Sequence, residues 1–67
     1  MAQRDRVLNY IQSNGSITAL EAMQDLGVID LAGRIRDLRR SGVNVVSTPM
    51  VVKNRFGEKC HIVRYEL

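Results

Sequence analysis

The chain has 67 residues, a formal net charge of +3 and an apolar fraction of 45%. A chain of this length holds one domain at most, here residues 1–67, and its apolar content is typical of a folded protein rather than a disordered one. Its one cysteine excludes a disulfide framework, and the sequence lacks both a signal peptide and an apolar run of roughly 20 residues, so we expect an intracellular protein outside the membrane.

The first predicted element is a helix over residues 3–13, where apolar side chains recur at helical spacing. Asn14 and Gly15 end it, because both tolerate the left-handed backbone that closes a helix. Ser16 and Ile17 then form a short extended link, which is at most a very short strand.

A second helix is predicted over residues 19–26 and ends at Gly27. Thr18 and Glu21 have the spacing of a capping box, in which the hydroxyl accepts one backbone N–H and the carboxylate accepts another. The apolar residues expected to be buried are Ala19, Leu20, Ala22, Met23 and Leu26.

The third helix, over residues 31–40, has the clearest apolar stripe. Leu31, Ile35 and Leu38 fall at i, i+4 and i+7. Asp30 stands where an N-cap is needed, and arginines occupy the last turn, where cations are favoured.

After residue 42 the pattern changes to β-branched residues without helix caps. This pattern predicts strands at residues 43–53 and 60–66, joined by a hairpin loop at 54–59. Pro49 cannot donate to a β-ladder, so the first strand is expected either to be interrupted there or to lie at a sheet edge. The predicted fold class is α+β: three helices followed by a two-stranded hairpin.

The short turn between the second and third helices gives them the plan of a helix-turn-helix, whose second helix enters the major groove of DNA. Glycine inside a helix costs about 1 kcal/mol relative to alanine, so we interpret Gly33 as facing outward, where its backbone can approach a groove wall or a neighbouring helix. The residues of this helix predicted to contact DNA are Gly33, Arg34, Arg36, Asp37, Arg39 and Arg40.

The four arginines of this helix are the densest charge on the chain. They form either a solvated face near a helix C-terminus or a DNA-binding surface. Arg34 and Asp37 stand at i, i+3 and can pair with each other. Arg36 and Arg40 lie on the free face and are the stronger candidates for base or phosphate contacts, with Arg34 and Arg39 on phosphates.

The hairpin loop carries a second group of cations, and a flexible cationic loop beside the major-groove helix is what a DNA-binding wing requires. The alternative is an ordinary hairpin turn, since Glu58 offsets part of the charge. Three roles stay open for Phe56: packing back onto the sheet, stacking or wedging against DNA, or contact with a protein. The wing residues predicted to contact DNA are Lys53, Asn54, Arg55, Phe56 and Lys59.

Over residues 12–22, 31–42, 53–57 and 63–67 the sequence resembles the small winged helix-turn-helix DNA-binding proteins common in bacteriophages and prophages. It is more distantly similar to the winged N-terminal domains of biotin-repressor-type regulators. The resemblance covers nearly the whole chain. It implies a winged-helix fold, double-stranded DNA as the partner, and a cytoplasmic, nucleoid-associated protein in a bacterial host cell.

No catalytic constellation is expected. Cys60 and His61 are neighbours in a predicted strand, so they point to opposite faces. That geometry suits neither a shared metal site nor a nucleophile–base pair. The sequence has no glycine-rich phosphate loop. We therefore predict a protein that is not an enzyme and uses no metal or cofactor.

Two functions of different classes follow. The first is a sequence-specific or architectural DNA-binding protein, such as a phage transcriptional regulator or an excisionase-like factor. A homodimer formed through the first helix or the sheet edge would increase the specificity of its DNA binding. The second is a winged-helix protein-interaction module, such as a phage inhibitor of a host nucleic-acid-handling or defence protein. Its contact would use Met50, Val51, Val52 and Phe56.

Overall fold

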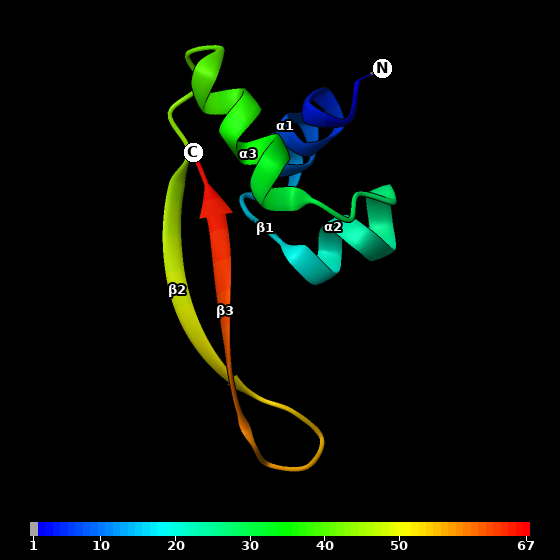
Figure 1. Cartoon of the computed structure of the whole chain (residues 1–67), viewed down its shortest axis with the longest axis vertical. Coiled ribbons are helices and arrows are strands. Elements are labelled where there is room, and N and C mark those ends of the chain that lie inside the picture. The colour runs from blue at the N-terminus through cyan, green and yellow to red at the C-terminus, as the bar shows by residue number, and fades with distance from the viewer. Residues whose placement is uncertain (1) are drawn as a thin grey trace.

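The computed structural model describes residues 2–67. The helices gather at one end, and the hairpin of the last two strands extends away from them (Figure 1). The predicted α+β fold, with three helices and a hairpin, is confirmed. The elements are α1 (Gln3–Asn14), β1 (Ile17–Thr18), α2 (Ala19–Leu26), α3 (Leu31–Arg40), β2 (Val46–Lys53) and β3 (Lys59–Glu66).

The caps that the sequence predicts are present. The N–H of Glu21 donates to Thr18 Oγ1 at 3.3 Å, and the N–H of Thr18 donates to Glu21 Oε1 at 2.9 Å, which completes the capping box of α2. Gly27 ends α2 with a left-handed φ of 67°. The bounds of α2 and α3 are those predicted, because local caps fix both ends of each helix.

The strands differ slightly from prediction. The first was expected from residue 43, but β2 begins at Val46. Val45 is only 4% exposed and belongs to the core. The N–H of Val43 donates to the carbonyl of Leu38 at 3.0 Å. The chain after α3 therefore packs on the helices before it joins the sheet. Lys59, assigned to the loop, is the first residue of β3.

The sheet has the order β1-β3-β2, and both pairings are antiparallel. β2 pairs with β3 along its whole length, from Val46–Glu66 to Lys53–Lys59. β1 pairs with β3 only at Tyr65 and Arg64. The outer part of the hairpin is consequently a two-stranded ribbon.

Pro49 lies in β2, at an edge of the sheet, opposite Val63. Near the loop, the N–H of Asn54 donates to the Glu58 carbonyl at 3.0 Å, and hydrogen-bonded pairs alternate along an antiparallel ladder. Pro49 is an odd number of residues from Asn54, so the pair that it forms with Val63 is one without ladder hydrogen bonds. At such a position of an edge strand the backbone N–H faces solvent, and the N–H that proline lacks is not needed. Of the two expectations, the edge position is confirmed and the interruption is wrong.

The core joins the inner sides of the three helices to β1 and to the segment before β2. The predicted stripe of α3 is buried in it. The buried apolar residues are Val7, Ile11, Ile17, Ala22, Val28, Leu31, Ile35, Leu38 and Val45.

The predicted burial of α2 is largely wrong. Only Ala22 is buried, whereas Leu20 is 58% and Met23 51% exposed. Ala19 is also exposed, and Leu26 is half-buried. Helical periodicity gives α2 an apolar side, but only the part of that side with a neighbour packed on it is removed from water.

A half-buried tyrosine that packs against the core links α1 to α2. The hydroxyl of Tyr10 donates to Asp25 Oδ2 at 2.7 Å and lies 3.5 Å from Glu21 Oε2. The hydrogen bond to Asp25, followed by desolvation and the negative charge of Glu21, raises the pKa of Tyr10 from 10.0 to about 12. The protonated hydroxyl therefore contributes to holding the two helices together.

Tyr10→Phe is expected to destabilise the protein at neutral pH and to have less effect in alkali. Because the pKa of Tyr10 is raised from 10.0 to about 12 on folding, the hydroxyl's contribution is fully present below pH 10 and is lost as the pH rises toward 12. Urea unfolding of both proteins, followed by circular dichroism at neutral pH and at steps between these two values, measures the difference. A difference independent of pH would contradict the assignment.

Candidate nucleic-acid interface

α3 is held from its inner side and at both ends. Leu31, Ile35 and Leu38 are buried. At the start the Asp30 carboxylate accepts the N–H of Gly33 at 3.1 Å, and at the end the N–H of Ser41 donates to the carbonyls of Asp37 and Leu38 at 3.1 Å. The outer face of α3 is thus presented on a firmly seated helix.

Two arginines on that outer face are available to a ligand. Arg36 and Arg40 are exposed, and the side chain of neither forms a hydrogen bond or ion pair with any other residue of the range 2–67. A guanidinium group carries five N–H donors in a planar fork that fits phosphate oxygens and the edge of guanine. The structure agrees with the sequence analysis that these two are the free cations of α3.

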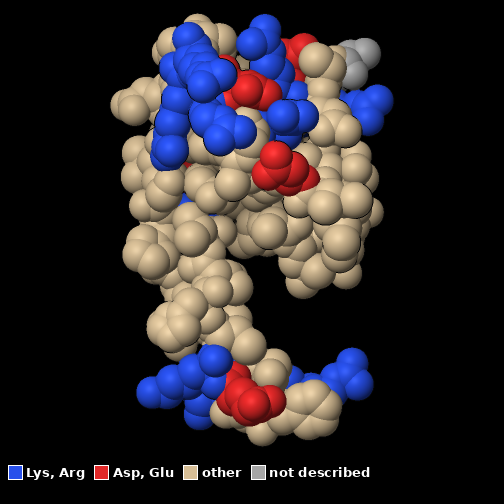
Figure 2. All heavy atoms as spheres, in the orientation of Figure 1, with Lys and Arg blue, Asp and Glu red and all other residues tan. Residues whose placement is uncertain are grey.

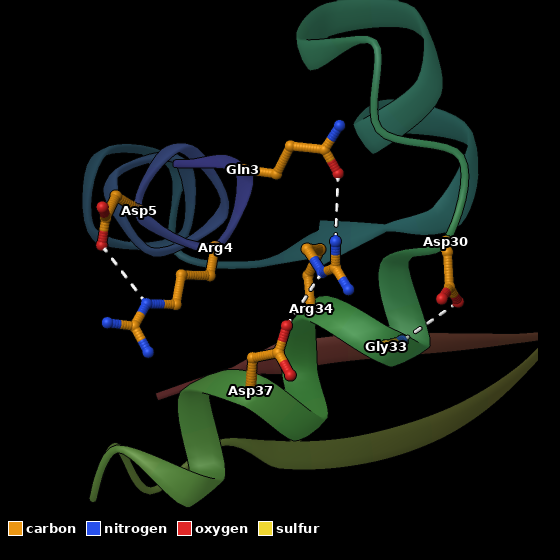
Figure 3. Close-up of polar contacts among 7 residues, drawn as sticks. All are labelled: Gln3, Arg4, Asp5, Asp30, Gly33, Arg34 and Asp37. Carbon is orange, nitrogen blue, oxygen red and sulfur yellow. Dashed lines mark hydrogen bonds and ion pairs between the residues drawn. The ribbon is translucent and has the colours of Figure 1, made fainter. Parts of the chain in front are cut away.

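Arg34 instead braces the helices. Its Nε lies 3.1 Å from Asp37 Oδ2, which confirms the pairing that the spacing allowed. Its Nη1 donates to Gln3 Oε1 of α1 at 3.3 Å (Figure 3). The charge of Arg34 is largely balanced, and its contact with α1 was not predicted, since nothing in the sequence links positions so far apart.

Arg39 connects α3 to the hairpin. Its Nε and Nη2 donate to the carbonyl of Val45 at 3.2 and 2.9 Å, and Nη2 also donates to Ser47 Oγ at 2.8 Å. These three bonds fix the start of β2 against the last turn of α3. Phosphate binding by Arg39 stays a prediction, and the side chain has this structural role as well.

The predicted outward exposure of Gly33 is wrong. Gly33 is buried, and Figure 3 shows the Asp30 carboxylate directed at it. A Cβ atom at position 33 would overlap Asp30 Oδ2. The geometry of the N-cap therefore explains why glycine stands here, rather than an approach to DNA.

The hairpin tip carries a second set of free cations. Lys53, Arg55 and Lys59 are exposed, and within residues 2–67 none of their side chains has a hydrogen-bond or ion-pair partner. Phe56 is 78% exposed. The structure thus excludes its packing back onto the sheet and leaves the roles in DNA or protein contact.

Asn54, predicted to contact DNA, organises the loop. Its Oδ1 accepts the N–H groups of Phe56 at 2.9 Å and Glu58 at 3.0 Å. Its Nδ2 donates to Glu58 Oε1 at 3.2 Å. Both ends of the amide are therefore used inside the loop.

The two basic groups lie at opposite ends of the molecule. Lys and Arg side chains gather at the helical end and again at the hairpin tip, with a mostly uncharged waist between them (Figure 2). The longest dimension is 38 Å, compared with 21 and 20 Å across. Sequence reasoning identified both groups but placed the wing beside α3, because it could not show how far the hairpin extends.

The described part of the chain offers no sign of a metal site. Within residues 2–67 no three side chains among His, Cys, Asp and Glu are grouped so that they could hold a metal ion. Cys60 is a free thiol. No helix in this range is long and apolar enough to cross a membrane.

Three helices, a short turn between the second and third, and an antiparallel hairpin after them define a winged helix-turn-helix protein. Comparison with family models matches residues 2–67 to the family described as winged helix-turn-helix domain, and the chain belongs to that family. Searches of curated proteins and of solved structures give no match.

Gly33→Ala is expected to lower the free energy of unfolding by about 1 kcal/mol or more, although alanine is the better helix former, because the added methyl displaces the Asp30 cap. In an Asp30→Ala background the same change should instead stabilise the protein, by up to about 1 kcal/mol. Urea unfolding of the four proteins measures both effects. The same sign in both backgrounds would show that Asp30 is not the constraint.

Arg39→Ala is expected to lower the free energy of unfolding by about 1–2 kcal/mol, since three hydrogen bonds from a charged donor are lost. Arg40→Ala removes an equal charge from the same turn and should change it by no more than about 0.5 kcal/mol. Thermal and urea unfolding compare the two variants. Equal stabilities would mean that Arg39 does not hold the hairpin to α3.

Proposed function

We propose that this protein binds double-stranded DNA with α3 in the major groove and the hairpin as a wing on the adjacent backbone. One observation carries this proposal. The side chains of Arg36 and Arg40 are exposed and have no hydrogen-bond or ion-pair partner among the described residues, whereas the other arginines of α3 have partners within the protein. These two side chains contact base edges or phosphates. Lys53, Arg55 and Lys59 contact phosphates at the wing.

The shape of α3 supports major-groove binding. Ten residues make a rod of about 15 Å, and the groove is about 12 Å wide and admits a helix. The exposed residue of the first turn is the small Ala32, and the long arginines follow it. The Asp37 carboxylate is paired with Arg34, and its remaining acceptor capacity would suit base amino groups rather than phosphates.

For the biological role we propose a transcriptional regulator of the bacteriophage or prophage type, or an excisionase-like architectural factor, located on the bacterial nucleoid. The resemblance of the sequence to such small proteins supports this role. One module of this size buries about 600–1,000 Å² of protein surface on DNA. Paired copies or repeated binding sites would therefore supply the specificity that a regulator needs.

A protein-interaction module is the second candidate function, and one observation favours it. A mostly apolar concavity of about 510 Å³ lies between the starts of α2 and α3 and the strand β3. Leu20, Ile29, Val52 and Val63 line it and are exposed. An apolar segment of a partner protein could fill this space, with Val51 and Phe56 adding to the contact.

Arg36→Ala and Arg40→Ala are each expected to weaken duplex binding. If the lost arginine contacts a base, the loss is about 1–3 kcal/mol; if it contacts a phosphate, the slope of the logarithm of the binding constant against the logarithm of the salt concentration falls by about one. Arg6→Ala is the matched control. Arg6 lines a shallow groove whose other residues belong to α1 and α2, so the loss of its charge should change affinity little. Fluorescence anisotropy with a labelled mixed-sequence duplex across a range of salt concentrations provides the measurement.

Three outcomes of this titration separate the proposals. Weakening by Arg36→Ala and Arg40→Ala beyond that of Arg6→Ala supports binding through α3. Equal effects of all three variants would mean that α3 does not read DNA. Absence of duplex binding by the unaltered protein, even at low salt, would favour the protein-interaction module.

A further inference from the structure

Phe56 is an aromatic residue at the hairpin tip, and its side chain belongs neither to the core nor to the packing of the sheet. Its side chain is 78% exposed. Single exposed apolar side chains are common on protein surfaces, so exposure alone indicates nothing. The hydrogen bonds that hold the loop and the charges around the ring are what indicate a ligand.

The loop is built to hold its tip in one conformation. The N–H of Phe56 itself donates to Asn54 Oδ1 at 2.9 Å, and the N–H of Gly57 donates to the Asn54 carbonyl at 3.0 Å. Gly57 has a φ of 77°, which favours glycine. The backbone that carries the ring is therefore anchored on both sides of it while the ring itself points into solvent.

The charges next to the ring are arranged for a polyanion. Lys53 and Lys59 stand directly opposite each other in the β2–β3 ladder, and like charges in that position repel and destabilise a sheet. Arg55 adds a third cation. The one acidic residue of the loop, Glu58, accepts a hydrogen bond from Asn54. Phosphates on either side of a narrow groove would relieve the repulsion between the two lysines.

The hairpin also has the reach that such a contact needs. β3 pairs with β1 last at Arg64, and the strand from there to Lys59 rises about 17 Å at about 3.4 Å per residue. With α3 in the major groove, a ribbon of this length can cross the phosphate backbone and place its tip at the neighbouring minor groove.

We propose that Phe56 is a wedge that enters the minor groove and inserts between two base pairs, with Lys53, Arg55 and Lys59 on the flanking phosphates. This inference rests on the proposed function and deepens it. An apolar side chain inserted at a base step partly unstacks it and kinks the duplex by about 20–90°. The protein therefore bends the DNA that it binds.

The test measures binding and bending on the same duplex. A duplex of about 30 base pairs, with dyes at its two ends and a central TA step that kinks easily, reports bending by energy transfer. The unaltered protein is expected to shorten the distance between the ends. Phe56→Ala should bind roughly tenfold more weakly and, at saturation, leave the duplex straight, because loss of the ring removes base stacking.

Two matched variants make the test specific. Phe56→Leu keeps an apolar wedge and should still bend the duplex, whereas Arg55→Ala should lower the salt dependence of binding and leave the bend in place. Since these side chains are exposed, unchanged thermal unfolding of each variant confirms that the fold is intact.

The failures of the two proposals are distinguishable. Duplex binding without bending by the unaltered protein, or equal bending by Phe56→Ala, would overturn the wedge and leave DNA binding standing. No binding of the duplex by the unaltered protein at low salt would overturn both the wedge and the proposed function.

Discussion

The burial of one side of α3 is the constraint on which the rest of the molecule depends. Leu31, Ile35 and Leu38 lie in the core, which also takes residues from α1, β1 and the segment leading into β2. Because these three positions share one side of the helix, their burial forces the opposite side into solvent. The polar face of α3 is thus displayed as a consequence of packing.

The arginines of α3 show how one residue type divides between structure and binding. Arg34 contacts α1, and Arg39 holds the start of β2. The side chains of Arg36 and Arg40 have no hydrogen-bond or ion-pair partner in the part of the chain that the structure describes. The bracing pair fixes the helix relative to its neighbours, so that the free pair projects from a defined position. A count of positive charges on this helix would overstate its binding surface.

The short strand β1 determines the shape of the other end. Because it pairs with β3 over two residues only, the rest of the hairpin extends beyond the helices and carries its cations to the far end of the long axis (Figure 2). In the proposed complex, the two separate basic groups would engage the duplex at two places. Phe56 stands at one of them, on a loop whose conformation Asn54 fixes.

The sequence by itself determined the three helices, the bounds of α2 and α3, and the hairpin, because caps such as Thr18 with Glu21 and changes in apolar spacing act within a few residues. It also identified Arg36 and Arg40, since helical geometry alone separates them from the buried stripe. Only the tertiary structure decided that Leu20 stays exposed and that Arg39 contacts the start of β2. Those outcomes depend on which distant segments pack together, and local spacing carries no information about that.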